Sequence, residues 1–196
     1  MTSMPQLVSL FNAVGGGAAA LLAIDDFVRL SGQHALDGSL AALDGWLIFF
    51  IVVDVIVGSV TFTGSLVASA KLMGKLKGQP IILPGGRILS AMAMIVAVSC
   101  SIVLVLAGAG LFNYETWVLN LLLVTALACA LIFGVTMVLP IGGADMPVVI
   151  SMLNAFTGTA VAMAGFVVGN VILIVAGALV GASGGILTKL MANAMN

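Results

Sequence analysis

The stretch that decides the fold is residues 142–158, which read GGADMPVVISMLNAFTG. It starts with two glycines, places Asp145 two residues before a proline, and continues as an apolar run that contains Asn154. Because proline is tolerated in the first turn of a helix, a helix is predicted to begin near residue 146. Polar residues inside an apolar helix are costly in a membrane and are usually functional, so this helix is the first place to look for function.

The composition identifies the class of protein. Of the 196 residues, 62% are hydrophobic and 7% are charged, and the mean hydropathy is +1.33. This is far too little charge for the surface of a soluble domain, so the chain is predicted to be an all-α membrane protein embedded in the lipid bilayer. The net charge of −1 gives no basis for nucleic-acid binding. Cys100 and Cys129 lie inside apolar runs, which favours buried packing over a disulfide or a metal site.

Six transmembrane helices are predicted to form a bundle, so that residues 1–196 make a single transmembrane domain. Each helix is long enough to cross about 30 Å of hydrocarbon. Their expected ranges are about 5–26, 46–72, 88–111, 116–139, 146–168 and 170–191. The polar segment from Asp25 to Asp44 is expected to be a connection in water.

The charges of the connections predict the orientation of the bundle. Four of the six basic residues lie at residues 71–87, and Lys189 lies near the end of the sixth helix. Lysine and arginine are retained on the cytoplasmic side of a membrane. Both chain ends and Asp145 are therefore expected to be cytoplasmic.

The first and fifth predicted helices look like copies of each other. MPQLVSLFNAVGG at residues 4–16 aligns without a gap with MPVVISMLNAFTG at residues 146–158. The matched positions that recur every three or four residues are Ser9, Asn12, Gly16 and Ala20 in the first copy and Ser151, Asn154, Gly158 and Ala162 in the second. Each helix therefore has one small, polar face. Two such faces could enclose a wet path or pack tightly together, and both alternatives stay open.

Asp54 is the most unusual polar residue of the chain. About ten residues of its helix precede it, which at ~1.5 Å per residue places it deep in the hydrocarbon. An ionised carboxylate there costs several kcal/mol unless it is paired or hydrated. Asp54 is either a neutral acid that ties helices together or a group that exchanges protons. Asn12 and Asn154 could likewise join helices or order water, and Asp145 could be a helix cap or a functional acid.

The sixth predicted helix has a face of small residues, formed by Gly177, Gly181, Ser183 and Gly184. Close packing against another helix is the usual meaning of such a face. The glycines do not follow a strand, so a phosphate-binding loop is excluded.

Residues 142–154, together with residues 4–8, 60–65 and 177–184, closely resemble the membrane domain of the β subunit of proton-translocating NAD(P)⁺ transhydrogenase. The resemblance runs over nearly the whole chain. It implies a membrane domain that couples inward proton movement to hydride transfer from NADH to NADP⁺. That chemistry takes place in separate nucleotide-binding domains, so this chain alone is expected to bind neither NAD(H) nor NADP(H) and to hold no catalytic or metal-binding residue.

The resemblance also implies partners and a location. We expect an α-type subunit with membrane helices and an NAD(H)-binding domain, a C-terminal NADP(H)-binding domain of the β subunit itself, and a homodimer of protomers in the cell inner membrane. The earlier β helices and the NADP(H) domain are expected to lie outside residues 1–196.

Individual residues match the family's pattern. Asp145 matches the acid at the junction between channel and NADP(H) domain, Asn154 matches the channel amide, and residues 177–184 resemble the helix that leads into that domain. Asn12 stands where many members have a channel histidine, so the titrating group is expected to be Asp54, Asp145 or a histidine of a partner subunit. The expected proton pathway comprises Asp145, Asn154, Asn12, Asp54, Ser151 and Ser9.

Two alternatives belong to other functional classes. The repeated helices could form a stand-alone secondary transporter, although the few polar residues argue against a large polar substrate site. The chain could also be a purely structural membrane subunit.

Overall fold

The computed structural model describes residues 4–37, 45–112 and 114–195. Within these ranges the protein is all-helical, and six helices are long and apolar enough to cross a membrane. They are α1 (Met4–Asp37), α2 (Gly45–Leu72), α3 (Gly86–Gly108), α4 (Thr116–Val138), α5 (Met146–Val168) and α6 (Val171–Met195), with a short 3-10 helix, η2 (Gly143–Asp145), before α5. The predicted all-α fold with six membrane-spanning helices is confirmed.

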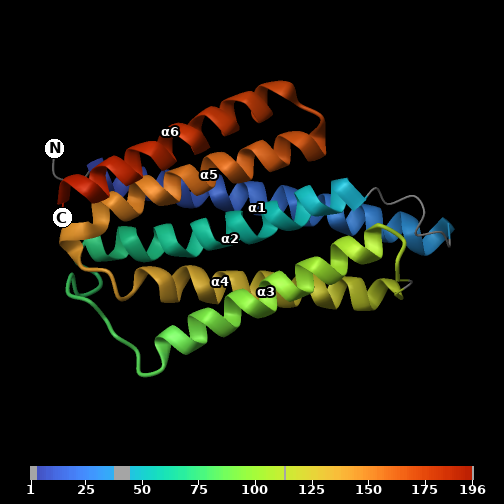
Figure 1. Cartoon of the computed structure of the whole chain (residues 1–196), viewed down its shortest axis with the longest axis horizontal. Helices are drawn as coiled ribbons and strands as arrows, with labels where there is room; N and C mark the ends of the chain where they lie inside the picture. The colour runs from blue at the N-terminus through green and yellow to red at the C-terminus, as the bar shows by residue number, and fades with distance from the viewer. Residues whose placement is uncertain (1–3, 38–44, 113, 196) are drawn as a thin grey trace.

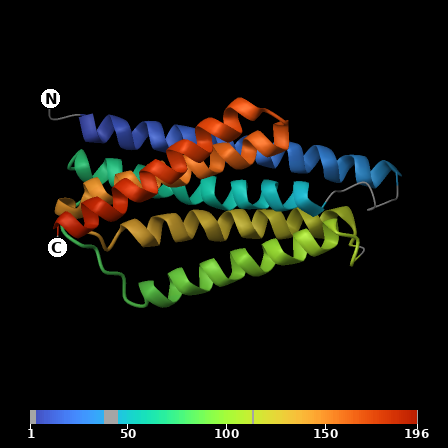
Figure 2. The same ribbon diagram turned by 45° about the horizontal axis from the view of Figure 1, so that its top comes forward.

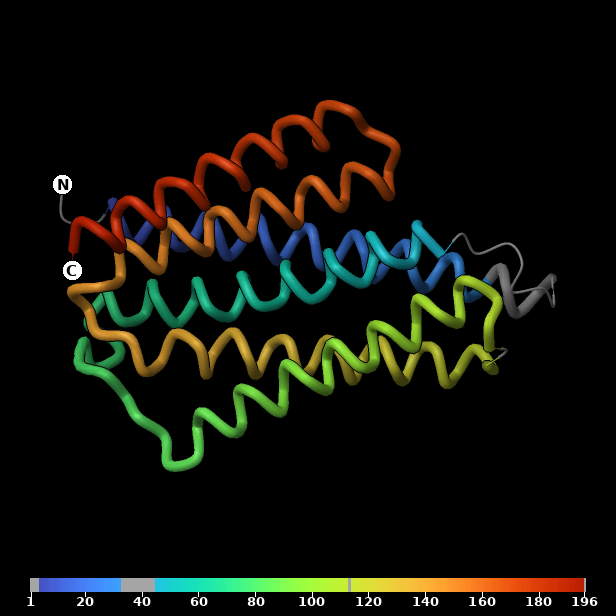
Figure 3. Tube along the Cα trace, in the orientation of Figure 1, coloured from blue at the N-terminus to red at the C-terminus, as the bar shows by residue number. Residues whose placement is uncertain are grey.

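The helices run roughly along one axis and form an elongated bundle (Figure 1). The start of α1 and the end of α6 lie at one end of the bundle, together with the α2–α3 and α4–α5 connections (Figures 1 and 3). We call this the terminal end. The terminal end carries the basic residues of the α2–α3 connection and also Asp145. That it faces the cytoplasm stays a prediction.

Helix α2 occupies the centre of the bundle. It packs against α1, α3, α4 and α5, while α6 packs mainly on α5 and α3 mainly on α4. Figures 1 and 2 accordingly show α5 and α6 on one side of α2 and α3 and α4 on the other. A residue on α2 can therefore be buried within the bundle while the outer faces of α3 and α6 stay open.

Small residues allow the closest helix contacts. A Cβ atom added to Gly58 of α2 would lie 2.6 Å from the carbonyl oxygen of Gly16 on α1. A Cβ atom added to Gly158 of α5 would lie 2.9 Å from the carbonyl oxygen of Gly177 on α6. Small residues are what lets helix backbones approach in lipid. The aligned glycines of the repeat, Gly16 and Gly158, thus occupy the same position in two hairpins.

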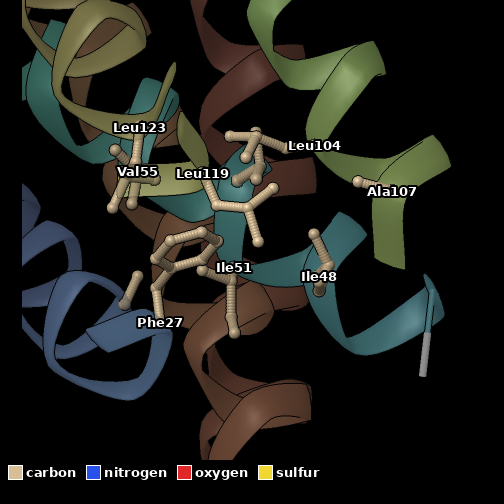
Figure 4. Close-up of a cluster of buried hydrophobic side chains, with 10 residues drawn as sticks. Phe27, Ile48, Ile51, Val55, Leu104, Ala107, Leu119 and Leu123 are labelled. Carbon is tan, nitrogen blue, oxygen red and sulfur yellow. The ribbon is translucent and has the colours of Figure 1, made fainter. Parts of the chain in front are cut away.

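Two apolar clusters fill the bundle. The cluster in Figure 4 joins Phe27 of α1, Ile51 of α2, Leu104 of α3 and Leu119 of α4, all at most 3% exposed. A second cluster at the terminal end joins α2, α4 and α5 around Met146 and Leu153. These clusters hold the central helix in place from both ends.

Helix α1 is longer than predicted. Its expected end at residue 26 and the expected connection from Asp25 are wrong, because the helix continues to Asp37. Asp25 and Arg29 form an ion pair of 2.9 Å on one helical face, and Phe27 and Ser31 are buried. The charges that indicate a loop thus lie on the outer face of a helix whose inner face is packed. Residues 38–44 of the predicted connection lie outside the described residues.

Candidate functional site

Polar side chains gather where α1, α2 and α5 meet. We call this set the polar interface. It comprises Gln6, Ser9 and Asn12 of α1, Asp54, Thr61, Ser65 and Ser69 of α2, and Thr157 of α5. Steps of three and four residues separate Asp54, Gly58, Thr61 and Ser65, so they share one helical face. Gly58 and Thr61 contact Gly16, which directs that face toward α1.

The part of the polar interface nearest the terminal end joins α1 to α2. Gln6 Nε2 donates to the carbonyl of Leu72 at 2.8 Å, and Ser69 Oγ donates to the carbonyl of Gln6 at 3.4 Å. Ser9, which is fully buried, donates through Oγ to the carbonyl of Ser65 at 2.8 Å. These bonds lock the relative position of the two helices along their axes.

Asn12 and Thr157 join α1 to α5. Asn12 Nδ2 donates to the carbonyl of Ile150 at 3.3 Å, and Thr157 Oγ1 donates to the carbonyl of Asn12 at 3.3 Å. Asn12 is 5% exposed. Asn154, its counterpart in the repeat, is half-buried and makes no hydrogen bond with a described residue. The first asparagine joins two helices, and the second has a free amide.

The other predicted residues of α5 and α6 divide between two environments. Ser151 Oγ accepts a hydrogen bond of 3.0 Å from Thr188 of α6. Gly177 and Gly184 are buried against α5, and Gly181 also approaches it. Ser183 is exposed and donates back to the carbonyl of Leu179 at 2.7 Å. The glycines therefore form the predicted close contact, whereas Ser183 lies on the outer side of α6.

Asp54 is completely buried, at 0% exposure. Neither of its carboxylate oxygens has a hydrogen-bond partner within the described part of the chain, and the same holds for the buried Oγ of Ser65 on the same face. Buried polar atoms without partners are rare in native proteins and require an explanation. The carboxyl group therefore lacks the interhelical hydrogen bonds expected of a purely structural acid.

An aromatic pair lies next to Asp54 on the side away from the terminal end. Phe50, one helical turn before Asp54, stacks on Phe166 of α5 with ring centroids 4.5 Å apart and an interplanar angle of 11°. In the other direction, α2 from Asp54 to Leu72 rises about 27 Å at ~1.5 Å per residue. The carboxyl group thus lies inside the bundle, between the aromatic pair and the rest of the polar interface.

Asp145 lies at the terminal end, at the junction of η2 and α5. It occupies the N-cap position of α5, but its side chain makes no capping hydrogen bond. The side chain is exposed. Asp145 is therefore available to groups outside the bundle and is well separated from Asp54.

Lys71 is a site residue that the sequence interpretation missed. It is 4% exposed, and its ammonium donates to the carbonyls of Val138 at 3.4 Å, Ile141 at 2.8 Å, and Leu139. These carbonyls belong to the end of α4 and the connection that leads to Asp145. The available signal was position, because Lys71 continues the face of α2 that carries the buried Gly64 and Ala68.

Two backbone bonds reinforce this arrangement. The Gly143 N–H donates to the carbonyl of Gly78 at 2.8 Å, and the Ile81 N–H donates to the carbonyl of Leu139 at 3.1 Å. The α2–α3 connection thus holds the α4–α5 connection. As a result, the segment before Asp145 is held both by Lys71 of α2 and by the α2–α3 connection.

Comparison with known proteins identifies the family. The whole chain, residues 1–196, matches the family model described as NAD(P) transhydrogenase beta subunit. Two curated sequences from Rhodospirillum rubrum, one of them from a named strain and both called NAD(P) transhydrogenase subunit beta, are each 39% identical to this chain over 196 residues. These matches cover 100% of this chain and 40% of each relative, so the chain spans about two fifths of their length. The resemblance found in the sequence is confirmed: the chain belongs to the NAD(P) transhydrogenase beta subunit family.

Proposed function

We propose that this chain is the membrane domain of a proton-translocating NAD(P)⁺ transhydrogenase. It couples inward proton movement to hydride transfer from NADH to NADP⁺ in nucleotide-binding domains outside these residues. Membership of the family and the six helices long enough to span a membrane support this proposal. NAD(H) and NADP(H) belong to the complete enzyme.

The observation that carries the proposal is the buried Asp54 carboxyl, whose oxygens have no partner among the described residues. We assign the uptake and release of the proton to this group. An ionised carboxylate without a partner in hydrocarbon costs several kcal/mol. Gain and loss of a proton at Asp54 are therefore tied to changes in its hydration or in the packing of α1, α2 and α5. Such a dependence is what a coupled proton carrier requires.

The remaining predicted residues receive distinct roles in this proposal. Asn154, whose amide is free of described partners, orders water on α5 next to Ser151. Ser9 and Asn12 hold α1 against α2 and α5 and so shape the path. Asp145, exposed at the terminal end, passes protons or conformational change between the path and the NADP(H)-binding domain. The glycines of α6 let that helix move with α5 as the link to the same domain.

The proposal includes partners and a location. An α-type subunit supplies the NAD(H)-binding domain and further membrane helices, and the β subunit supplies its own NADP(H)-binding domain. Two protomers form a dimer in the cell inner membrane, with the terminal end in the cytoplasm. The open apolar faces of α3 and α6 support contacts with lipid and with these partners.

The experiment uses the assembled enzyme in sealed vesicles, with proton pumping and hydride transfer measured separately. We expect Asn154→Leu and Asp145→Leu to abolish pumping while the isolated nucleotide domains keep their hydride-transfer activity. Thr125→Val is the control, because the hydroxyl of Thr125 bonds only to the backbone of its own helix. Unchanged pumping in both variants would contradict the proposed roles. Solute flux without nucleotides would instead favour a secondary transporter.

A further inference from the structure

A cavity of about 430 Å³ lies between α3 and α4 at the terminal end. Its apolar lining includes Ile82, Leu83, Phe133 and Met137. Here α3 diverges from α4, and residues 73–85, which connect α2 to α3, pass beside the end of α4 (Figures 1 and 2). The volume is within the range of ligand-binding pockets. The cavity opens on the outside of the bundle, because Ile82 is 81% exposed.

Three polar side chains line this cavity, and two of them are already satisfied. Ser90 Oγ donates to the carbonyl of Gly86 at 2.9 Å, and Thr136 Oγ1 donates to the carbonyl of Ile132 at 3.0 Å. Arg87 is the third. Its guanidinium forms no ion pair or hydrogen bond with any residue in the described ranges. The cavity therefore combines an apolar interior with one free cation.

The charges around the cavity are strongly unbalanced. Lys75, Lys77 and Lys189 are exposed at the same end of the bundle, where Asp145 is the one acid among the described residues. A guanidinium matches the geometry of a phosphate, with which it can form two parallel hydrogen bonds. Additional lysines favour a ligand with a net negative charge near the membrane surface. The surroundings thus complement an anionic group attached to an apolar chain.

We propose that this cavity binds an anionic glycerophospholipid, with its phosphate on Arg87 and part of an acyl chain between α3 and α4. The position suits this ligand, because the ends of spanning helices lie at the level of the lipid headgroups. The site is independent of the proton path, since neither Asp54 nor Asn154 lines the cavity. Lipid bound there supports α3 at the point where α3 diverges from α4. This point is next to the α2–α3 connection, which holds the segment before Asp145.

The dimensions of the cavity favour a lipid over a helix of a partner subunit. The α4 part of the lining, from Phe133 to Leu139, rises about 9 Å at ~1.5 Å per residue. A transmembrane helix needs a groove of about 30 Å to lie along the bundle. Beyond the cavity α3 and α4 pack on each other, so the groove does not continue.

The test uses the assembled enzyme in vesicles that contain phosphatidylglycerol or phosphatidylcholine, each with a photoreactive acyl chain. After illumination, cross-linked peptides are identified by mass spectrometry. We expect phosphatidylglycerol to label residues 81–90 and 133–140 several-fold more than phosphatidylcholine does. Arg87→Gln should lower the phosphatidylglycerol labelling to the phosphatidylcholine level, and Ile82→Trp should reduce labelling by both lipids.

Lys189→Gln is the matched control, because it removes the same charge at the same end but does not line the cavity. It should leave the labelling of residues 81–90 and 133–140 unchanged. Equal labelling by the two lipids, or full labelling in Arg87→Gln, would overturn the proposal. A cross-link from these residues to a partner helix, in place of lipid, would overturn it as well.

Discussion

Asn12 of α1 donates a hydrogen bond of 3.3 Å to the carbonyl of Ile150 on α5, whereas its aligned counterpart, Asn154, makes no such bond with a described residue. The two copies of the repeat therefore differ in the use of the same side chain. The side chain of Asn12, in the first copy, bonds to the second copy and so joins the two. The free amide of Asn154 is the one available to water. Asn12 therefore suits a structural role, and Asn154 suits a role in proton movement.

This difference predicts opposite results for two alanine substitutions. Asn12→Ala removes an interhelical bond and should lower the free energy of unfolding by about 1 kcal/mol. Asn154→Ala should leave the free energy of unfolding unchanged but reduce proton pumping. Stability is measured by detergent-induced unfolding of the purified enzyme, and pumping is measured in vesicles. A large loss of stability in Asn154→Ala would show that Asn154 also serves as an interhelical contact.

The close contacts of the two hairpins predict matched glycine effects. Gly16→Ala and Gly158→Ala should each lower the free energy of unfolding by about 1–3 kcal/mol, because the added Cβ overlaps the facing helix. Thermal unfolding of the purified enzyme provides the measurement. Gly32→Ala in α1 and Gly185→Ala in α6 are the controls, since nothing lies within 4 Å of a Cβ added there. If all four variants had the same stability, the helices would not pack as described.

The buried ammonium of Lys71 predicts a local effect at the α4–α5 connection. Lys71→Met leaves the carbonyl of Ile141 without its ammonium donor and takes one of two donors from the carbonyls of Val138 and Leu139, which should cost about 1–3 kcal/mol. Hydrogen exchange at residues 141–146 should become faster. Lys75→Met is the control, because Lys75 is exposed. Equal exchange rates in the two variants would mean that Lys71 does not hold this connection.

The stack of Phe50 on Phe166 predicts that protons reach the Asp54 carboxyl more easily when one ring is removed. Phe50→Ala removes the contact with Phe166 and opens the side of Asp54 that faces away from the terminal end. We expect proton leak through vesicles that contain this variant in the absence of nucleotides. Phe11→Ala is the matched control, since Phe11 is 72% exposed on α1 and takes no part in the stack. A tight membrane in the Phe50 variant would mean that the stack does not limit access.

The helices were predictable because apolar runs of membrane length are a direct consequence of the hydrocarbon around them. The end of α1 was not predictable from the sequence. Charged residues such as Asp25 and Arg29 suit a loop and the outer face of a helix equally. The repeat placed Gly16 and Gly158 correctly at close contacts, since small-residue spacing reports helix packing. The different hydrogen bonding of Asn12 and Asn154 depends on which helices face these residues. The sequence pattern does not say which helices are neighbours.

Lys71 illustrates the same limit. From the sequence, its charge indicated only on which side of the membrane it lies. Its contacts with the carbonyls could not be predicted, because those carbonyls lie about seventy residues later in the chain. Asp54, in contrast, was identifiable from sequence as an acid in an apolar run. Its complete burial and its lack of partners among the described residues come from the packing of α2 at the centre of the bundle.

The most direct measurement is proton pumping by Asp54→Asn in the assembled enzyme, reconstituted in sealed vesicles and driven by hydride transfer. The amide has the same shape but cannot release a proton, so pumping should fall to the background level while the protein stays folded. Asp25→Asn, an exposed carboxyl-to-amide change, should pump normally. If Asp54→Asn pumps protons as fast as the unmodified enzyme, Asp54 is not the proton-carrying group and the central claim is wrong.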